Sequence, residues 1–376
     1  MQTPFRKKIG SYAVGAGGGG QWNMKREIQS AIPRELNING KTYRPLIAAI
    51  LLKFDANLTT DGTTSLTSAD LATLMKEFYF ADAGGERYRF DGFDARVFQY
   101  QELGIGTPVE PAALAISQTG QVRSYLHLIP FALPRALRPS DFAIPVDDAC
   151  DGAADWRVDI ATPTDVRKSG SNLTINSITV TAYVYLLPEL GIECKARLMC
   201  LKYSDANQTD VRIPVNNKAL RSLSVYQKAA GGGTAMSNFT SATFPAFQSV
   251  QLERAMLQQE YLSGMAYDGL VPRVADDPVS NNKVVPLFTP PIKAVHFPRI
   301  ERELEANFVN SVGGQMDYLI TEVDRQNGAI VANTIERYSL DPSLQKTAPV
   351  KTVGKSSNRT RAAWGKQAST MPLKLD

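Results

Sequence analysis

The residue types that most often carry catalysis or bind metals are few and scattered in this chain. His127 and His296 each lie alone in an apolar strand context. Metal sites and nucleophilic triads usually need clustered His, Cys or carboxylate groups. Cys150, Cys194 and Cys200 form no Cys-x-x-Cys pair. We therefore interpret both histidines as structural and the three cysteines as buried free thiols.

Carboxylates offer two other kinds of chemistry. Asp147, Asp148 and Asp151 form a small acidic cluster that could bind Ca²⁺, but it lacks the regular ligand spacing and closing Glu of a calcium loop. We interpret this cluster as a solvated loop. A β-sandwich glycosidase would need two facing acids, and the sequence singles out no pair among its candidates. The candidate acids are Glu253, Glu260, Glu301, Glu303 and Glu305.

The glycine runs carry no Lys-Ser/Thr ending, so they are not phosphate-binding loops. No catalytic constellation therefore survives, and we expect that the protein is not an enzyme and holds no cofactor or metal.

The two ends of the chain are strongly basic. Residues 1–35 hold six Lys or Arg against two Glu, and residues 346–376 hold seven against one Asp. The middle must then be acidic, because the whole chain carries only +4. Such ends could bind anionic lipid, where each charge is worth about 1 kcal/mol, or the phosphates of nucleic acid. The candidate contact residues are Arg6, Lys7, Lys8, Lys25, Arg26, Lys346, Lys351, Lys355, Arg359, Arg361, Trp364 and Lys366.

Composition indicates how these ends behave. Gly17 to Gly20 should cost too much entropy to pack as a regular element, so residues 1–35 are predicted to be an arm that orders only against neighbours. Residues 346–376 are rich in Ser, Thr, Asn and Pro and should be extended. A flexible terminus without function and a tail that only keeps the protein soluble remain open alternatives.

Most elements between the two ends are predicted strands. Residues 43–54 are apolar on both faces, and residues 174–186 alternate apolar and polar side chains with a period of two. A capping box at residues 67–70 predicts a short helix, and residues 77–90 predict a hairpin around two glycines. A second short helix is expected over residues 94–103.

The order of elements starts again after residue 190. Strands are expected over residues 197–203, 211–215, 220–226, 284–288, 308–312 and 318–323, and a helix over residues 251–262. The fold class is therefore predicted to be all-β: two tandem eight-stranded jelly rolls, each with a short inserted helix, plus extended N- and C-terminal arms. The expected domains are an arm (1–35), a first jelly roll (36–190), a second jelly roll (191–345) and a tail (346–376).

No apolar run approaches the roughly 20 residues that span a bilayer, and no apolar segment follows the first basic residues as in a signal peptide. Synthesis in the cytosol, without export by that route, is therefore expected.

Residues 44–54, 66–70, 89–103, 127–131 (HLIPF), 172–186 and 197–214 together carry a resemblance. In their order they resemble the double jelly-roll major capsid proteins of tailless, membrane-containing icosahedral viruses, especially bacteriophages. The resemblance implies a structural virion protein that forms homotrimeric, pseudo-hexagonal capsomers. It also implies contacts with neighbouring capsomers, minor capsid or vertex proteins and an internal lipid membrane, with a possible genome contact through the basic tails.

Two alternatives remain open at this point. One is a carbohydrate-binding or carbohydrate-active double β-sandwich, such as a phage receptor-binding protein, which gives no reason for two basic ends. The other is a minor vertex or spike protein of the same virion.

Overall fold

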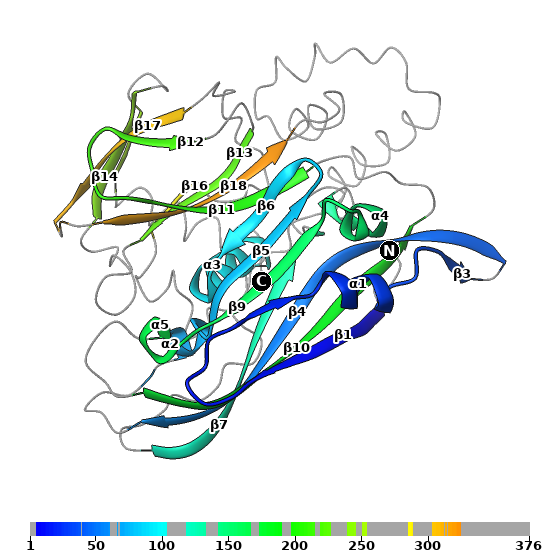
Figure 1. Ribbon diagram of the computed structural model, residues 1–376. Coiled ribbons are helices and arrows are strands. Elements are labelled where there is room, and N and C mark those ends of the chain that lie inside the picture. Colours follow the sequence, from blue (N-terminus) through cyan, green and yellow to red (C-terminus); the bar gives the residue numbers. More distant parts are fainter. Residues whose placement is uncertain are drawn as a thin grey trace, which may run out of the picture.

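The computed structural model describes residues 5–38, 40–60, 66, 68–103, 118–132, 142–166, 173–189, 197–214, 219–226, 239–245, 250–253, 285–288, 303–311, 313 and 315–324 (Figure 1). Residues 346–376, Cys194, His296, Glu260 and Glu301 lie outside these ranges. None of the described helices is long and apolar enough to cross a membrane.

A six-stranded sheet forms one wall of the first half. Its strands are β1 (Phe5–Val14), β3 (Leu36–Ile38), β4 (Lys41–Thr60), β7 (Gln118–Pro130), β8 (Ile144–Pro145) and β10 (Leu173–Glu189). The long strand β4 lies at its centre and pairs antiparallel with β10 and β7. In β10, Val180, Ala182 and Val184 are buried while Tyr183 and Tyr185 face outward, which confirms the predicted period of two.

An eight-stranded sheet runs through both halves in the order β16-β13-β18-β11-β6-β5-β9-β2. Its strands are β2 (Gln21–Asn23), β5 (Met75–Asp82), β6 (Gly85–Phe90), β9 (Asp155–Ile160), β11 (Arg197–Asp205), β13 (Ala219–Tyr226), β16 (Val285–Phe288) and β18 (Met316–Asp324). Strands β6 and β11 pair in parallel, with Cys200 opposite Tyr88 and Leu201 opposite Arg89. This pairing joins the two halves through one continuous sheet (Figure 1).

A four-stranded sheet faces the second half of the eight-stranded sheet (Figure 1). It consists of β12 (Val211–Pro214), β14 (Phe239–Phe244), β15 (Val250–Glu253) and β17 (Glu303–Asn310). The described helices all lie in the first half. They are α1 (Lys25–Ala31), α2 (Ser68–Ala72), α3 (Gly92–Leu103), α4 (Val146–Cys150) and α5 (Pro163–Val166).

Each half has its own hydrophobic core between two sheets. In the first core, Phe80 stacks on Trp156 with ring centroids 3.8 Å apart, and Phe54 lies in the same cluster. In the second core, Phe308 packs on Tyr318 at 5.4 Å. The predicted all-β fold of two sandwiches is thus confirmed.

The predicted N-terminal arm is wrong for residues 5–32. Strand β1 pairs with β10 along its whole length, β2 pairs with β9, and α1 buries Ile28 in the first core. Between β1 and β2 the chain passes from the six-stranded to the eight-stranded sheet. Gly17 to Gly20 form this corner with positive φ angles, which residues other than glycine rarely adopt. At Gly18 a Cβ atom would lie 2.6 Å from the carbonyl oxygen of Ala161, so only glycine fits there.

Two further predictions fail locally. The helix expected over residues 251–262 begins as a strand, since residues 251–253 belong to β15, and the rest lies outside the described residues. The loop expected at Asp147, Asp148 and Asp151 contains α4, which holds the first two of these acids in its first turn.

Candidate functional site

Helix α3 lies between the two sandwiches, and most of its polar side chains are buried there. Asp91 accepts hydrogen bonds from the backbone N–H groups of Phe93 (2.9 Å) and Asp94 (3.0 Å), and the Asp94 carboxylate accepts one from the Asp91 N–H (2.9 Å). These reciprocal bonds cap the N-terminus of the helix. Its buried polar residues are Asp94, Arg96, Gln99, Gln101 and Glu102.

Strand β13 explains why these polar groups tolerate burial. Its Leu223 and Val225 point into the second core, so the side chains between them must point the other way, toward α3. Tyr226 donates its O–H to Asp94, and the Ser222 hydroxyl donates to Gln101 (3.3 Å).

Arg221 adds an ion pair to the same interface. Its Nε and Nη2 each donate to one oxygen of Glu102 at 2.9 Å. The Glu102 side chain is fully buried and that of Arg221 is 11% exposed. The bidentate geometry fixes the orientation of the second sandwich relative to α3.

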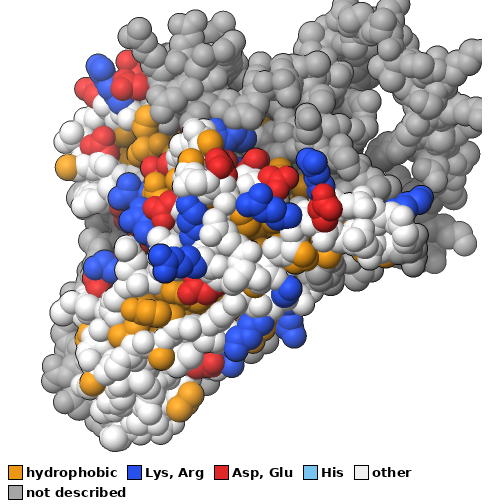
Figure 2. All heavy atoms as spheres, turned by 45° about the vertical axis from the view of Figure 1, so that its right-hand side comes forward, with side chains coloured by type: hydrophobic (Ala, Val, Ile, Leu, Met, Phe, Trp, Pro, Cys, Tyr) orange, Lys and Arg blue, Asp and Glu red, His pale blue; other side chains and the backbone are white. Residues whose placement is uncertain are grey.

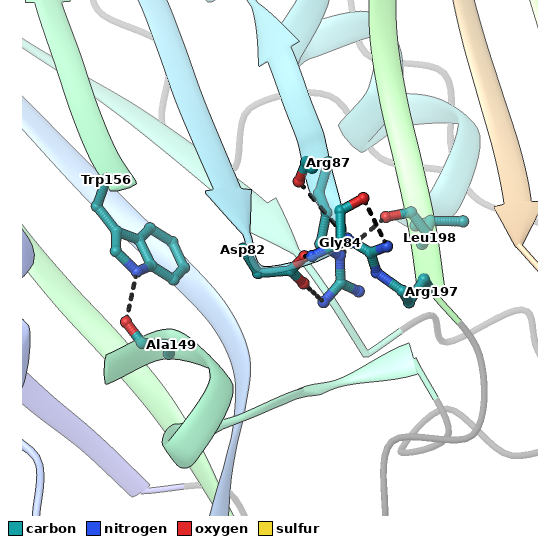
Figure 3. Close-up of polar contacts among 8 residues, drawn as sticks. Asp82, Gly84, Arg87, Ala149, Trp156, Arg197 and Leu198 are labelled. Carbon is teal, nitrogen blue, oxygen red and sulfur yellow. Dashed lines mark hydrogen bonds and ion pairs between the residues drawn. The ribbon is translucent and has the colours of Figure 1, made fainter. Parts of the chain in front are cut away.

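A second set of buried charges lies where β6 meets β11 (Figure 3). The Asp82 carboxylate lies between two guanidinium groups: it pairs with Arg87 at 3.3 Å and also with Arg197. Arg87 donates to the Leu198 carbonyl (3.3 Å), and Arg197 donates to the Gly84 carbonyl (3.0 Å). A Cβ atom at residue 84 would lie 1.8 Å from the Arg197 guanidinium, so a larger residue there would displace this side chain from its position beside Asp82.

These two sets of contacts form what we call the polar junction: α3 with β13, and the β5–β6 hairpin with β11. The contacts of Arg221, Ser222, Tyr226, Arg197 and Leu198 join the second half to the first, whereas the Asp82–Arg87 ion pair lies within the first half. Together with the continuous eight-stranded sheet, the polar junction holds the two sandwiches in one fixed orientation.

Burial also governs the pKa values inside the junction. Burial raises the pKa of Asp94 to about 7, although nearby Lys202 and the Tyr226 hydroxyl act in the opposite direction. It raises the pKa of the Cys200 thiol as well. Cys150 and Cys200 are buried free thiols, as predicted.

His127 lies inside the first core against Phe54 and Tyr125, with ring centroids 5.6 and 4.7 Å apart. Burial and the nearby charge of Arg96 lower its pKa to about 3, so the ring is neutral at ordinary pH. This position supports a structural role. In the described part of the chain, no group of three or more His, Cys, Asp or Glu side chains could hold a metal ion.

The predicted basic contact residues fall in two places. Arg6, Lys7 and Lys8 lie on β1, the edge strand of the six-stranded sheet, where the register shifts between Lys8 and Gly10. Lysines and bulges on an edge strand discourage unwanted strand pairing, which is one structural role of these residues. Lys25 and Arg26 lie on α1, and the Lys25 ammonium donates to the Gly152 carbonyl at 2.7 Å. The C-terminal members of the set, from Lys346 to Lys366, lie outside the described residues.

The outer face of the six-stranded sheet changes character along its length. At one end it carries Ser177, Asn57 and Asp55, whereas the other end is apolar and half-buried. We call this second part the apolar sheet end. It consists of Ala49, Leu51, Leu126, Leu128, Tyr183 and Tyr185.

Sequence comparison finds no match, neither among family models nor among curated proteins. Solved structures of viral proteins match over most of the chain. The crystal structure of the MCP of STIV gives a TM-score of 0.50 at 14% identity, covering 88% of this chain and 99% of that one. The atomic structure of Sulfolobus turreted icosahedral virus gives 0.52 at 13% identity, covering 90% and 97%. The major capsid protein P2 from bacteriophage PM2 also matches, with a TM-score of 0.45 at 9% identity over 87% and 99%.

At such identities the likeness shows the fold alone. The chain has the double jelly-roll fold of these viral major capsid proteins, which confirms the resemblance predicted from the order of its elements.

Sequence reasoning did not find the polar junction. Arg197 and Asp82 are 115 residues apart, and Tyr226 and Asp94 are 132 apart, so no local motif links them. One signal was present: the charged and amide side chains of α3 cover more than the one solvent-facing stripe of an amphipathic helix, which is unusual beside the core residues Phe93, Val97 and Phe98.

Proposed function

We propose that this chain is a structural capsid subunit that self-assembles into a virion shell and has no catalytic role. The observation that carries the proposal is the match of the whole double sandwich to the Sulfolobus virus structure, over 90% of this chain and 97% of that one. A shell subunit must present its two sandwiches in one orientation, and the shared sheet and the polar junction provide this rigidity.

The finer proposal is a homotrimer that forms a pseudo-hexagonal capsomer, because two sandwiches per chain give six in a trimer. A three-fold ring cannot be built from isologous contacts, so each subunit must use two different surfaces toward its neighbours. In the assembled shell the capsomers would contact one another, minor capsid or vertex proteins and an internal membrane. The protein would be made in the host cytoplasm and end in the virion.

The assembly state of the purified chain tests this function. Sedimentation velocity should show a species of three times the chain mass, and electron microscopy should show pseudo-hexagonal particles or shells. A chain that remains monomeric at every concentration would contradict the proposal. Glycan binding by such a stable monomer would instead favour the carbohydrate-binding alternative.

The basic segment 346–376 is proposed to contact the internal membrane or the genome through Lys346, Lys351, Lys355, Arg359, Arg361, Trp364 and Lys366. Deleting residues 346–376 should abolish co-sedimentation with one anionic partner while leaving the oligomeric state unchanged. Each cation near an anionic surface contributes about 1 kcal/mol, so the loss should be large at low salt and small at high salt.

Two parallel assays separate the partners: phosphatidylcholine vesicles with and without phosphatidylglycerol, and duplex DNA. Binding to the anionic vesicles alone assigns the segment to the membrane, and binding to DNA alone assigns it to the genome. Equal binding by the full-length and the shortened chain in both assays would refute a role for the segment.

A further inference from the structure

The apolar sheet end lies beside the positive charges of Arg6 and Lys8, which form no ion pair with the residues that the structure describes. Across the outer face, Arg6 is opposite Tyr185 and Lys8 is opposite Tyr183, and the Arg6 guanidinium lies over the Tyr183 ring at 5.1 Å. Lys53 on the same face is already paired with Asp55 at 2.9 Å. Figure 2 shows hydrophobic side chains with Lys and Arg side chains beside them on the surface of the lower part of the molecule, which the six-stranded sheet occupies.

This composition is unlike a face that only meets water. When one face of an antiparallel sheet packs on the core, the side chains of the other face are normally polar. The Ser177 end of this sheet is largely so, although Val122, opposite Asn57, is 62% exposed there. Tyrosine and arginine beside aliphatic side chains are instead typical of the central part of a protein interface. The apolar sheet end with Arg6 and Lys8 therefore has the character of a contact surface.

The second sandwich carries a surface of the opposite sign. On β17 the side chains of Glu303, Glu305 and Val309 point outward, away from the buried Leu304, Ala306 and Phe308. Val309 is 53% exposed, which is rare for a large hydrophobic residue in the described part of the chain. Arg212 lies opposite Glu305 and pairs with Glu303 at 3.7 Å, so the local balance is still negative.

We infer that the apolar sheet end, with Arg6 and Lys8, docks on the outer face of β17 in a second copy of this chain. The inference rests on the proposed trimer and names the surfaces that form it. Two basic faces would repel each other, whereas a basic face and an acidic face attract, so the contact is heterologous. Because both faces belong to one chain, each subunit can engage two neighbours and the ring can close.

Two of the basic residues expected from the sequence to contact lipid or nucleic acid then have another partner. Arg6 and Lys8 would meet Glu303 and Glu305 of a neighbouring subunit rather than lipid or nucleic acid. The C-terminal segment keeps the anionic partner proposed above.

Charge reversal of each face, alone and combined, tests the inference. The basic-face variant R6E/K8E and the acidic-face variant E303K/E305K should each raise the dissociation constant of the trimer about tenfold or more. The quadruple variant R6E/K8E/E303K/E305K again gives the two faces opposite charges, so its dissociation constant should return to near the wild-type value. Sedimentation velocity over a concentration series measures all of them.

R26E/K41E is the matched control, because it reverses one exposed arginine and one exposed lysine elsewhere in the first half. It should trimerise like the wild type, and far-UV circular dichroism should show that all variants are folded. If the wild type trimerises and the two face variants do so equally well, the inferred surfaces are wrong while the proposed function stands. If the wild type itself never trimerises, the proposed function is wrong as well.

Discussion

Replacing Asp82 with alanine should lower the free energy of unfolding by about 3–5 kcal/mol, because it leaves two guanidinium groups buried without their shared counter-ion. The side chains of Arg87, Arg197 and Asp82 are 0%, 8% and 8% exposed, so water cannot replace the lost carboxylate. The substitution also removes the acceptor for the Gly84 N–H at 2.9 Å in the β5–β6 turn. Urea denaturation followed by tryptophan fluorescence measures the loss.

Glu77→Ala is the matched control for this prediction. Glu77 pairs with Arg89 at 3.2 Å on the same hairpin, but the two side chains are 31% and 55% exposed. Such a pair contributes about 1 kcal/mol or less. Replacing Arg197 with methionine in the Asp82→Ala background should recover part of the stability, since one uncompensated charge disappears. An Asp82→Ala variant no less stable than Glu77→Ala would show that the junction does not depend on this ion cluster.

The sequence predicts those parts of the fold whose cause is local. The alternation along β10 places every second side chain in the core without reference to any other segment, and the predicted strand matches the observed one closely. The hairpin around Gly84 and Gly85 and helix α3 are likewise determined by turn and capping residues within a few positions.

Long-range pairing explains what the sequence could not predict. The glycine-rich composition around Gly17 to Gly20 suggests an unpacked arm, but Ser11 meets Thr181 on β10, 170 residues away, and that pairing orders the segment. From the sequence, the serines of β13 would be assigned to a solvent-exposed face, because alternation shows only that they point away from the core of the sandwich. It does not show whether that face contacts water or a buried helix. The polar junction depends on such tertiary contacts throughout.

The pH dependence of stability should reveal the buried Asp94 carboxyl. Its pKa rises from 3.8 in the unfolded chain to about 7 in the folded protein, chiefly because of burial. Between these values the folded state holds a proton that the unfolded state has lost, so the contribution of Asp94 to the free energy of unfolding falls as the pH rises. A shift of this size corresponds to about 4 kcal/mol, fully lost above about pH 7.

His127 acts in the opposite direction. Its pKa falls from 6.5 to about 3 on folding, so its contribution to the free energy of unfolding is lost as the pH falls below about 6.5. The wild-type profile therefore combines two opposed trends. Only a comparison with an Asp94 variant isolates the carboxyl, because His127 is unchanged in both proteins.

At about pH 4 the folded protein holds Asp94 protonated, so the Asp94→Asn variant differs chiefly by one lost capping bond and should be less stable than the wild type. At about pH 8 the wild type has lost the contribution of the protonated carboxyl, so the variant should match or exceed its stability. An asparagine can still accept the Tyr226 O–H, but it cannot become charged beside Asp317, whose carboxylate also disfavours ionisation of Asp94. Tyr226→Phe removes a hydrogen bond that favours the charged carboxylate, so it should raise the pKa of Asp94 and move the loss of stability to higher pH. Loss of the positive charge of Lys202 should act in the same direction. Urea denaturation at intervals from about pH 4 to about pH 8 measures these differences. Parallel profiles for the wild type and Asp94→Asn would mean that Asp94 does not titrate in this range, and that its burial in the polar junction is compensated by its partners.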